Sequence, residues 1–107
     1  MSETKKKYCI DTEENKRFLG ELREELLSFG HRFPSPGGGS YYLGDDGTPW
    51  KERNRETWIT SRMAHVYSIG TMLSHEGSAT LAEAAIKGLT GELKDVANGG
   101  WYAGLTA

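Results

Sequence analysis

Three segments of the chain repeat apolar residues at steps of three and four, the spacing that places side chains on one face of an α-helix. Residues 12–29 are amphipathic, with one stripe that we expect to be buried: Phe18, Leu19, Leu22, Leu26 and Phe29. Residues 55–73 are apolar over most of the circumference, so we expect this helix to be buried on more than one side. Residues 78–94 form the third helix, and the short connection before it predicts antiparallel neighbours. The three segments indicate an all-α fold.

Residues with capping preferences mark the ends of these helices. Asp11 or Thr12 suits the N-cap of the first helix, and Ser78 suits that of the third. Gly30 follows the first helix, where a left-handed residue is common. We therefore predict well-defined ends.

A stretch rich in glycine and proline, residues 34–49, interrupts the helical pattern. Asp46-Gly47 is a strong signal for a tight turn. Residues 41–43 before it and residues 48–50 after it are both short, which predicts an ordered loop or a short hairpin and does not favour a large sheet.

Composition excludes several classes of protein. The chain has 107 residues, which predicts one small domain, and a net charge of −2, which disfavours a nucleic-acid partner. Cys9 is the single cysteine, so no internal disulfide forms, and we expect a reducing, cytoplasmic compartment. Residues 1–11 are expected to be a flexible N-terminus without the apolar run of a signal peptide, and no stretch is apolar enough to span a membrane.

The C-terminal end carries a glycine-rich turn with two aromatic residues. Trp101 and Tyr102 follow Gly99-Gly100 close to the end of the sequence. We expect nothing after this pair for it to pack against, which indicates a unit cut from a larger array of helical hairpins. An incomplete core and a broad thermal transition are expected for the isolated chain.

Two spaced motifs carry a resemblance to a known family. They are Trp58-Ile59-Thr60-Ser61-Arg62-Met63-Ala64-His65-Val66-Tyr67 and Gly99-Gly100-Trp101-Tyr102, preceded by Gly38-Gly39-Ser40-Tyr41-Tyr42-Leu43. From about Phe18 onward the chain resembles the N-terminal part of the N-acylglucosamine 2-epimerase superfamily. Within it, the bacterial aldose–ketose isomerases that act on D-mannose or sulfoquinovose are the most similar.

The resemblance implies an α/α barrel of six helical hairpins, of which residues 12–107 are the N-terminal segment. Residues 55–73 would be an inner helix that lines the sugar pocket, between outer helices at residues 12–29 and 78–94. The implied reaction is aldose–ketose isomerisation of a mannose-like sugar through an enediol, with two histidines as acid and base and no metal or cofactor. Those histidines are expected beyond residue 107. No catalytic residue is therefore assigned here, and we expect this chain alone to be inactive.

Three residues at steps of four and three are candidates for contact with the sugar: Trp58, Arg62 and His65. Arg62 matches the family arginine that contacts sugar oxygens, although an ion pair with Glu56 or another carboxylate on a solvated face is the alternative. Trp58 fits an aromatic wall or a packed core, and His65 fits the pocket or a hydrogen-bonded buried site.

Other residues are assigned no site. His31 and His75 lie at helix ends, where a cation is favoured. Asp45 and Asp46 are read as turn residues and not as metal ligands. The glycines at 37–39 lack the context of a phosphate loop.

A second class of function remains open from the sequence. The chain could be a non-catalytic helical module that binds sugar or associates with copies of itself, because a lone hairpin unit cannot cover its inner face.

Overall fold

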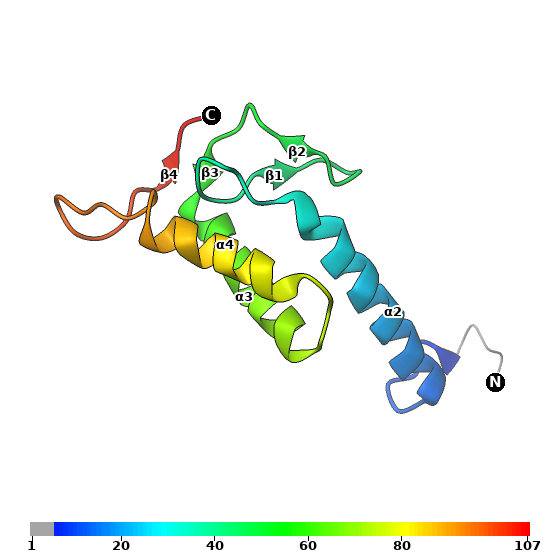
Figure 1. The fold of residues 1–107 in the computed structure, drawn as a ribbon. Helices are drawn as coiled ribbons and strands as arrows, with labels where there is room; N and C mark the ends of the chain where they lie inside the picture. The colour runs from blue at the N-terminus through cyan, green and yellow to red at the C-terminus, as the bar shows by residue number, and fades with distance from the viewer. Residues whose placement is uncertain (1–5) are drawn as a thin grey trace.

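The computed structural model describes residues 6–107 and is rich in helix (Figure 1). Its elements in chain order are α2 (Glu13–Phe29), η1 (Gly30–Arg32), β1 (Tyr42–Leu43), β2 (Pro49–Trp50), β3 (Arg55–Glu56), α3 (Thr57–Met72), α4 (Ser78–Thr90) and β4 (Gly104–Leu105). The molecule measures 61 × 26 × 21 Å, because α2 extends away from the paired α3 and α4. The three predicted helices are confirmed, together with small sheets. The barrel itself stays a prediction.

α3 and α4 pack closely as antiparallel neighbours, as predicted. Gly70 allows this approach, because a Cβ at that position would clash with the Ser78 hydroxyl. The prediction that Ser78 caps α4 is wrong: Gly77 occupies the cap with a left-handed φ of +84°, and Ser78 is fully buried. Within residues 6–107, the Ser78 hydroxyl has no hydrogen-bond partner.

α2 begins as predicted but buries a different face. The Thr12 hydroxyl accepts a hydrogen bond of 3.0 Å from the Asn15 amide and caps the helix. The predicted stripe is mostly solvent-exposed, and Leu27 is the apolar residue of α2 that enters the core. The reason is that α2 approaches the other helices only at its C-terminal end (Figure 1). Gly30 follows in a right-handed conformation, φ −81°, and leads into η1, so the expected left-handed cap is also wrong.

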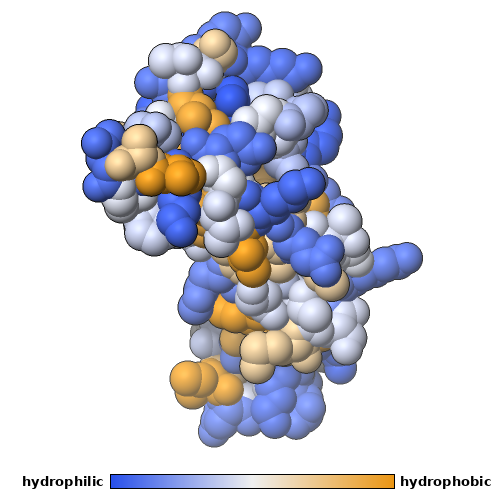
Figure 2. Space-filling view, turned by 60° about the vertical axis from the view of Figure 1, so that its left-hand side comes forward, coloured by the Kyte–Doolittle hydropathy of each residue, from blue (hydrophilic) through white to orange (hydrophobic). Residues whose placement is uncertain are grey.

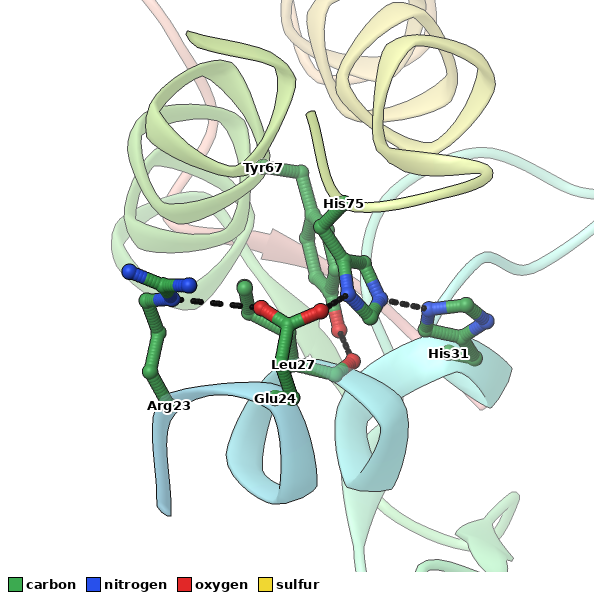
Figure 3. Close-up of polar contacts among 6 residues, drawn as sticks. All are labelled: Arg23, Glu24, Leu27, His31, Tyr67 and His75. Carbon is green, nitrogen blue, oxygen red and sulfur yellow. Dashed lines mark hydrogen bonds and ion pairs between the residues drawn. The ribbon is translucent and has the colours of Figure 1, made fainter. Parts of the chain in front are cut away.

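The core gathers where the end of α2 meets α3 and α4. It consists of Leu27, Phe33, Tyr67, Ala82 and Ala85. The rings of Phe33 and Tyr67 stack with centroids 5.4 Å apart. The Tyr67 hydroxyl donates a hydrogen bond of 2.5 Å to the Leu27 carbonyl (Figure 3), and burial raises the pKa of Tyr67 to about 12.

The predicted hairpin is confirmed. β1 and β2 pair antiparallel, with Tyr42 opposite Trp50 and Leu43 opposite Pro49. Gly47 takes a left-handed φ of +81° at the turn, and the Asp46 carboxylate accepts a hydrogen bond of 2.9 Å from the Thr48 amide.

A second strand pair was not predicted. β3 and β4 pair antiparallel, with Arg55 opposite Leu105 and Glu56 opposite Gly104, so α3 begins at Thr57 and not at Arg55. The Trp101 indole donates a hydrogen bond of 2.6 Å to the Leu89 carbonyl. The end of the chain thus folds back onto α4 and the start of α3, while Trp101 and Tyr102 stay 56% and 46% exposed, as expected for this aromatic pair.

The N-terminal residues that the structure describes lie against the start of α2. The Asn15 side chain donates a hydrogen bond of 2.5 Å to the Lys7 carbonyl, and the Tyr8 and Phe18 rings meet edge to face at 5.6 Å. Residues 1–5 of the predicted flexible terminus lie outside the described part. Across residues 6–107, each helix is too short or too polar to cross a bilayer.

Candidate functional site

The three candidate residues lie on one exposed face of α3. Trp58, Arg62 and His65 are all exposed, whereas Thr60 and Tyr67 on the opposite side of the helix are buried. Rotation by about 100° per residue explains this division, because positions 58, 62 and 65 then point away from positions 60 and 67. This face is open to solvent, so the prediction that the helix at residues 55–73 is buried on more than one side is wrong: its buried residues, Thr60, Tyr67 and Gly70, share one side.

Arg62 lies over the indole of Trp58 and not beside a carboxylate. Its guanidinium carbon is 4.8 Å from the centre of the Trp58 ring, a favourable cation–π geometry. Glu56, the alternative partner considered from the sequence, instead accepts a hydrogen bond from the Trp58 indole N–H. Within residues 6–107, no acceptor binds the Arg62 guanidinium, so its N–H donors remain available.

Further aromatic and cationic side chains extend this arrangement. The Tyr42 ring lies 6.5 Å from that of Trp58, and the Arg53 guanidinium lies 3.9 Å from the centre of the Tyr42 ring and 5.4 Å from that of Trp50. We call these five side chains the aromatic row: Trp50, Arg53, Tyr42, Trp58 and Arg62. Three of them come from the hairpin region, and sequence reasoning missed them because only the fold brings residues 42–53 beside α3.

The aromatic row has the chemistry of a surface for polar ligands with apolar faces. Indole and phenol rings pack against C–H groups, and guanidinium groups donate several hydrogen bonds in a fixed geometry. Among the described residues, no group of three or more His, Cys, Asp or Glu side chains is placed so that it could hold a metal ion.

An apolar groove of about 310 Å³ lies next to the aromatic row. Its walls come from α2, the hairpin and α3: Leu26, Phe29, Tyr41, Tyr42, Leu43, Ile59, Met63, Val66 and Tyr67. Apolar residues also reach the surface in the space-filling view (Figure 2). Such a lining suits a packed helix better than a sugar, whose hydroxyl groups need polar partners.

The remaining two histidines, His31 and His75, form a polar cluster with Glu24 (Figure 3). His75 Nδ1 lies 2.9 Å from a Glu24 carboxylate oxygen, and His75 Nε2 lies 2.8 Å from His31 Nε2. The hydrogen bond from His75 lowers the pKa of Glu24, and the hydrogen bond from Arg23 lowers it further. These contacts tie α2 and η1 to the connection between α3 and α4, which is a structural role.

Comparisons with known proteins match the part of the chain that carries the sequence motifs. The family described as N-acylglucosamine 2-epimerase (GlcNAc 2-epimerase) matches residues 38–107, which include the hairpin, α3, α4 and the terminal strand. A D-mannose isomerase from Thermobifida fusca is 29% identical over 91 residues. The match covers 85% of this chain but 22% of that relative, so the chain spans about a fifth of the relative's length.

Proposed function

Because this chain belongs to the N-acylglucosamine 2-epimerase family, we propose that it is the N-terminal segment of an α/α-barrel sugar isomerase or epimerase. The proposed reaction is the aldose–ketose isomerisation of a mannose-like sugar in the cytoplasm. The similarity to a D-mannose isomerase supports this choice of substrate.

The observation that carries the proposal is the Arg62 guanidinium held over the Trp58 indole on an exposed face. Isomerisation through an enediol builds negative charge on a sugar oxygen. A fixed cation with available N–H donors stabilises that charge, and Arg62 provides both. Trp58 provides an apolar surface beside the sugar, and His65, one turn after Arg62, contributes a further polar contact.

We further propose that this chain has no isomerase activity by itself. The reaction needs one group to remove the proton beside the carbonyl and one to return it, and each such group contributes about 10²–10⁴-fold. Among the described histidines, His31 and His75 are hydrogen-bonded to one another in the cluster with Glu24. His65 alone shares the face of Arg62, so a complete acid–base pair is not assembled.

The test combines binding with turnover. Titration of the chain with D-mannose or D-fructose, followed by ¹H–¹⁵N NMR, should shift the Trp58 indole and Arg62 signals, and the response should disappear in Arg62→Ala. Arg17→Ala, at an exposed position on α2, is the matched control and should leave the response unchanged. The chain should not convert mannose to fructose, whereas the Thermobifida relative should do so and lose most activity when its matching arginine becomes alanine.

Two results would contradict these proposals. Rapid turnover by the 107-residue chain would show that the catalytic groups are present within it. Full activity of the arginine-to-alanine variant in the relative would show that Arg62 has a structural role.

Self-association is a second proposal, favoured by the exposed stripe of α2. Leu19, Leu22, Leu26 and Phe29 are 51%, 38%, 63% and 45% exposed, at the alternating three- and four-residue steps of a coiled-coil seam. An isolated helix of this length is only marginally stable in water. We propose that a second copy of the chain covers this stripe with its own α2.

A further inference from the structure

We infer that Glu56 is a positioning residue for the sugar-binding face: its carboxylate fixes the Trp58 indole, and the indole holds the Arg62 guanidinium in place. The effect on sugar binding rests on the proposed function, whereas the effect on the geometry of Arg62 does not.

The backbone of Glu56 is held from both sides. It pairs with Gly104 across the β3–β4 ladder, and its carbonyl accepts a hydrogen bond of 2.8 Å from the Thr60 hydroxyl. A Cβ at position 104 would lie 2.9 Å from the Arg55 carbonyl oxygen and 3.1 Å from the Glu56 Cα, so glycine is needed for this close pairing. The base of the Glu56 side chain is thus fixed in space.

The carboxylate of Glu56 is not used to cap the helix. Glu56 occupies the N-cap of α3, yet its side chain accepts no hydrogen bond from the backbone of the first turn. Glutamate is also not among the residues favoured at this position. The carboxylate instead accepts a hydrogen bond from the Trp58 indole N–H, two residues later.

This hydrogen bond determines which way the indole points. Trp58 is 49% exposed, so core packing alone does not fix its ring. With its N–H directed at Glu56, the ring lies under the Arg62 guanidinium at 4.8 Å. Because Arg62 has no acceptor of its own among residues 6–107, the ring is the contact that restrains it.

The geometry can be tested by NMR on the intact chain. In the wild type, the Trp58 indole proton should resonate downfield of that of Trp50, which is equally exposed at 49%. Ring currents from Trp58 should shift the Arg62 side-chain protons upfield. Glu56→Ala should reduce both effects, whereas Glu56→Gln, which keeps an oxygen acceptor, should retain most of each. Glu52→Ala, at an exposed position outside the row, is the matched control and should change neither.

The functional arm measures the affinity for D-mannose. Removal of a hydrogen bond at a partly exposed site should raise the Kd about three- to tenfold in Glu56→Ala, with recovery in Glu56→Gln. Circular dichroism should show that both variants keep their helix content.

The outcomes separate this inference from the proposed function. Arg62 proton shifts that stay unchanged in Glu56→Ala, or that are lost equally in Glu56→Gln, would overturn the positioning role. If the wild type does not bind mannose, the proposed substrate fails, and the Arg62 shifts alone then decide the role of Glu56.

Discussion

The Tyr67 hydroxyl donates a hydrogen bond of 2.5 Å to the main-chain carbonyl of Leu27, which joins the middle of α3 to the last turn of α2. Tyr67 is only 1% exposed and also stacks on Phe33. One side chain therefore links three segments of the chain.

Replacement of Tyr67 by phenylalanine should keep the stacking and remove the hydrogen bond. The free energy of unfolding should fall by about 1–3 kcal/mol, because a buried carbonyl loses its partner. Urea denaturation measures this change, with Tyr102→Phe as the control at an exposed position. An unchanged stability in Tyr67→Phe would show that water or the helix backbone satisfies the Leu27 carbonyl.

The contact between Glu24 and His75 should make stability depend on acidity. The folded-state pKa of Glu24 lies below its usual 4.5, chiefly because of the hydrogen bond from His75. Its contribution to stability is therefore present above about pH 4.5 and is lost as the pH falls through the folded-state pKa. Glu24→Gln should lower the melting temperature near neutral pH, and the two melting temperatures should converge once the pH has fallen below the folded-state pKa of Glu24. Glu25→Gln, at an exposed neighbouring position, is the control, and its melting temperature should show the same dependence on pH as that of the wild type.

Substitution by alanine at two glycines should change the free energy of unfolding in opposite directions. A Cβ at Gly88 would lie 2.7 Å from the Gly39 backbone nitrogen, whereas a Cβ at Gly20 would have no neighbour within 4 Å. Gly88→Ala should cost about 1–3 kcal/mol through overpacking. Gly20→Ala should stabilise α2 by up to about 1 kcal/mol through higher helix propensity. Thermal unfolding of both variants checks the pair, and a stabilised Gly88→Ala would contradict the close contact between α4 and the glycine-rich loop.

Self-association should depend on the stripe of α2. Light scattering after size-exclusion chromatography should show an assembly for the wild type and a monomer for Leu26→Lys, because a charge at the seam must stay in water. Ile86→Lys changes an apolar residue on α4 that is 47% exposed and should leave the assembly intact. A monomeric wild type across a wide range of concentrations would exclude this proposal.

Local signals predicted the parts of the fold that depend on neighbouring residues. Asp46-Gly47 predicted the hairpin, and Thr12 predicted the start of α2, because a turn and a cap are determined within a few residues. The pairing of Glu56 with Gly104 was missed, since two short strands so far apart in the chain leave no periodic pattern. The buried face of α2 was predicted wrongly. An amphipathic pattern indicates an apolar face, but it does not show which part of the helix contacts the rest of the protein.

The candidate site also combines features that the sequence predicts with features that depend on the folded structure. Helical spacing placed Trp58 and Arg62 on one face, and the structure brings their side chains together. Tyr42 and Arg53 join them only through the folded hairpin, and the choice of Trp58 over Arg62 as the partner of Glu56 depends on side-chain orientation.

α2 is attached to the rest of the protein near its C-terminal end, and its N-terminal part extends away from the other helices (Figure 1). Its 17 residues span about 25 Å at 1.5 Å per residue, and the contacts of Leu27 with Tyr67 and of Glu24 with His75 lie toward its C-terminal end. A small rotation of α2 about these contacts therefore moves its far end, at Glu13, several times farther than it moves the residues at the contacts. The angle between α2 and the pair of α3 and α4 therefore depends on the few side chains that pack around Tyr67.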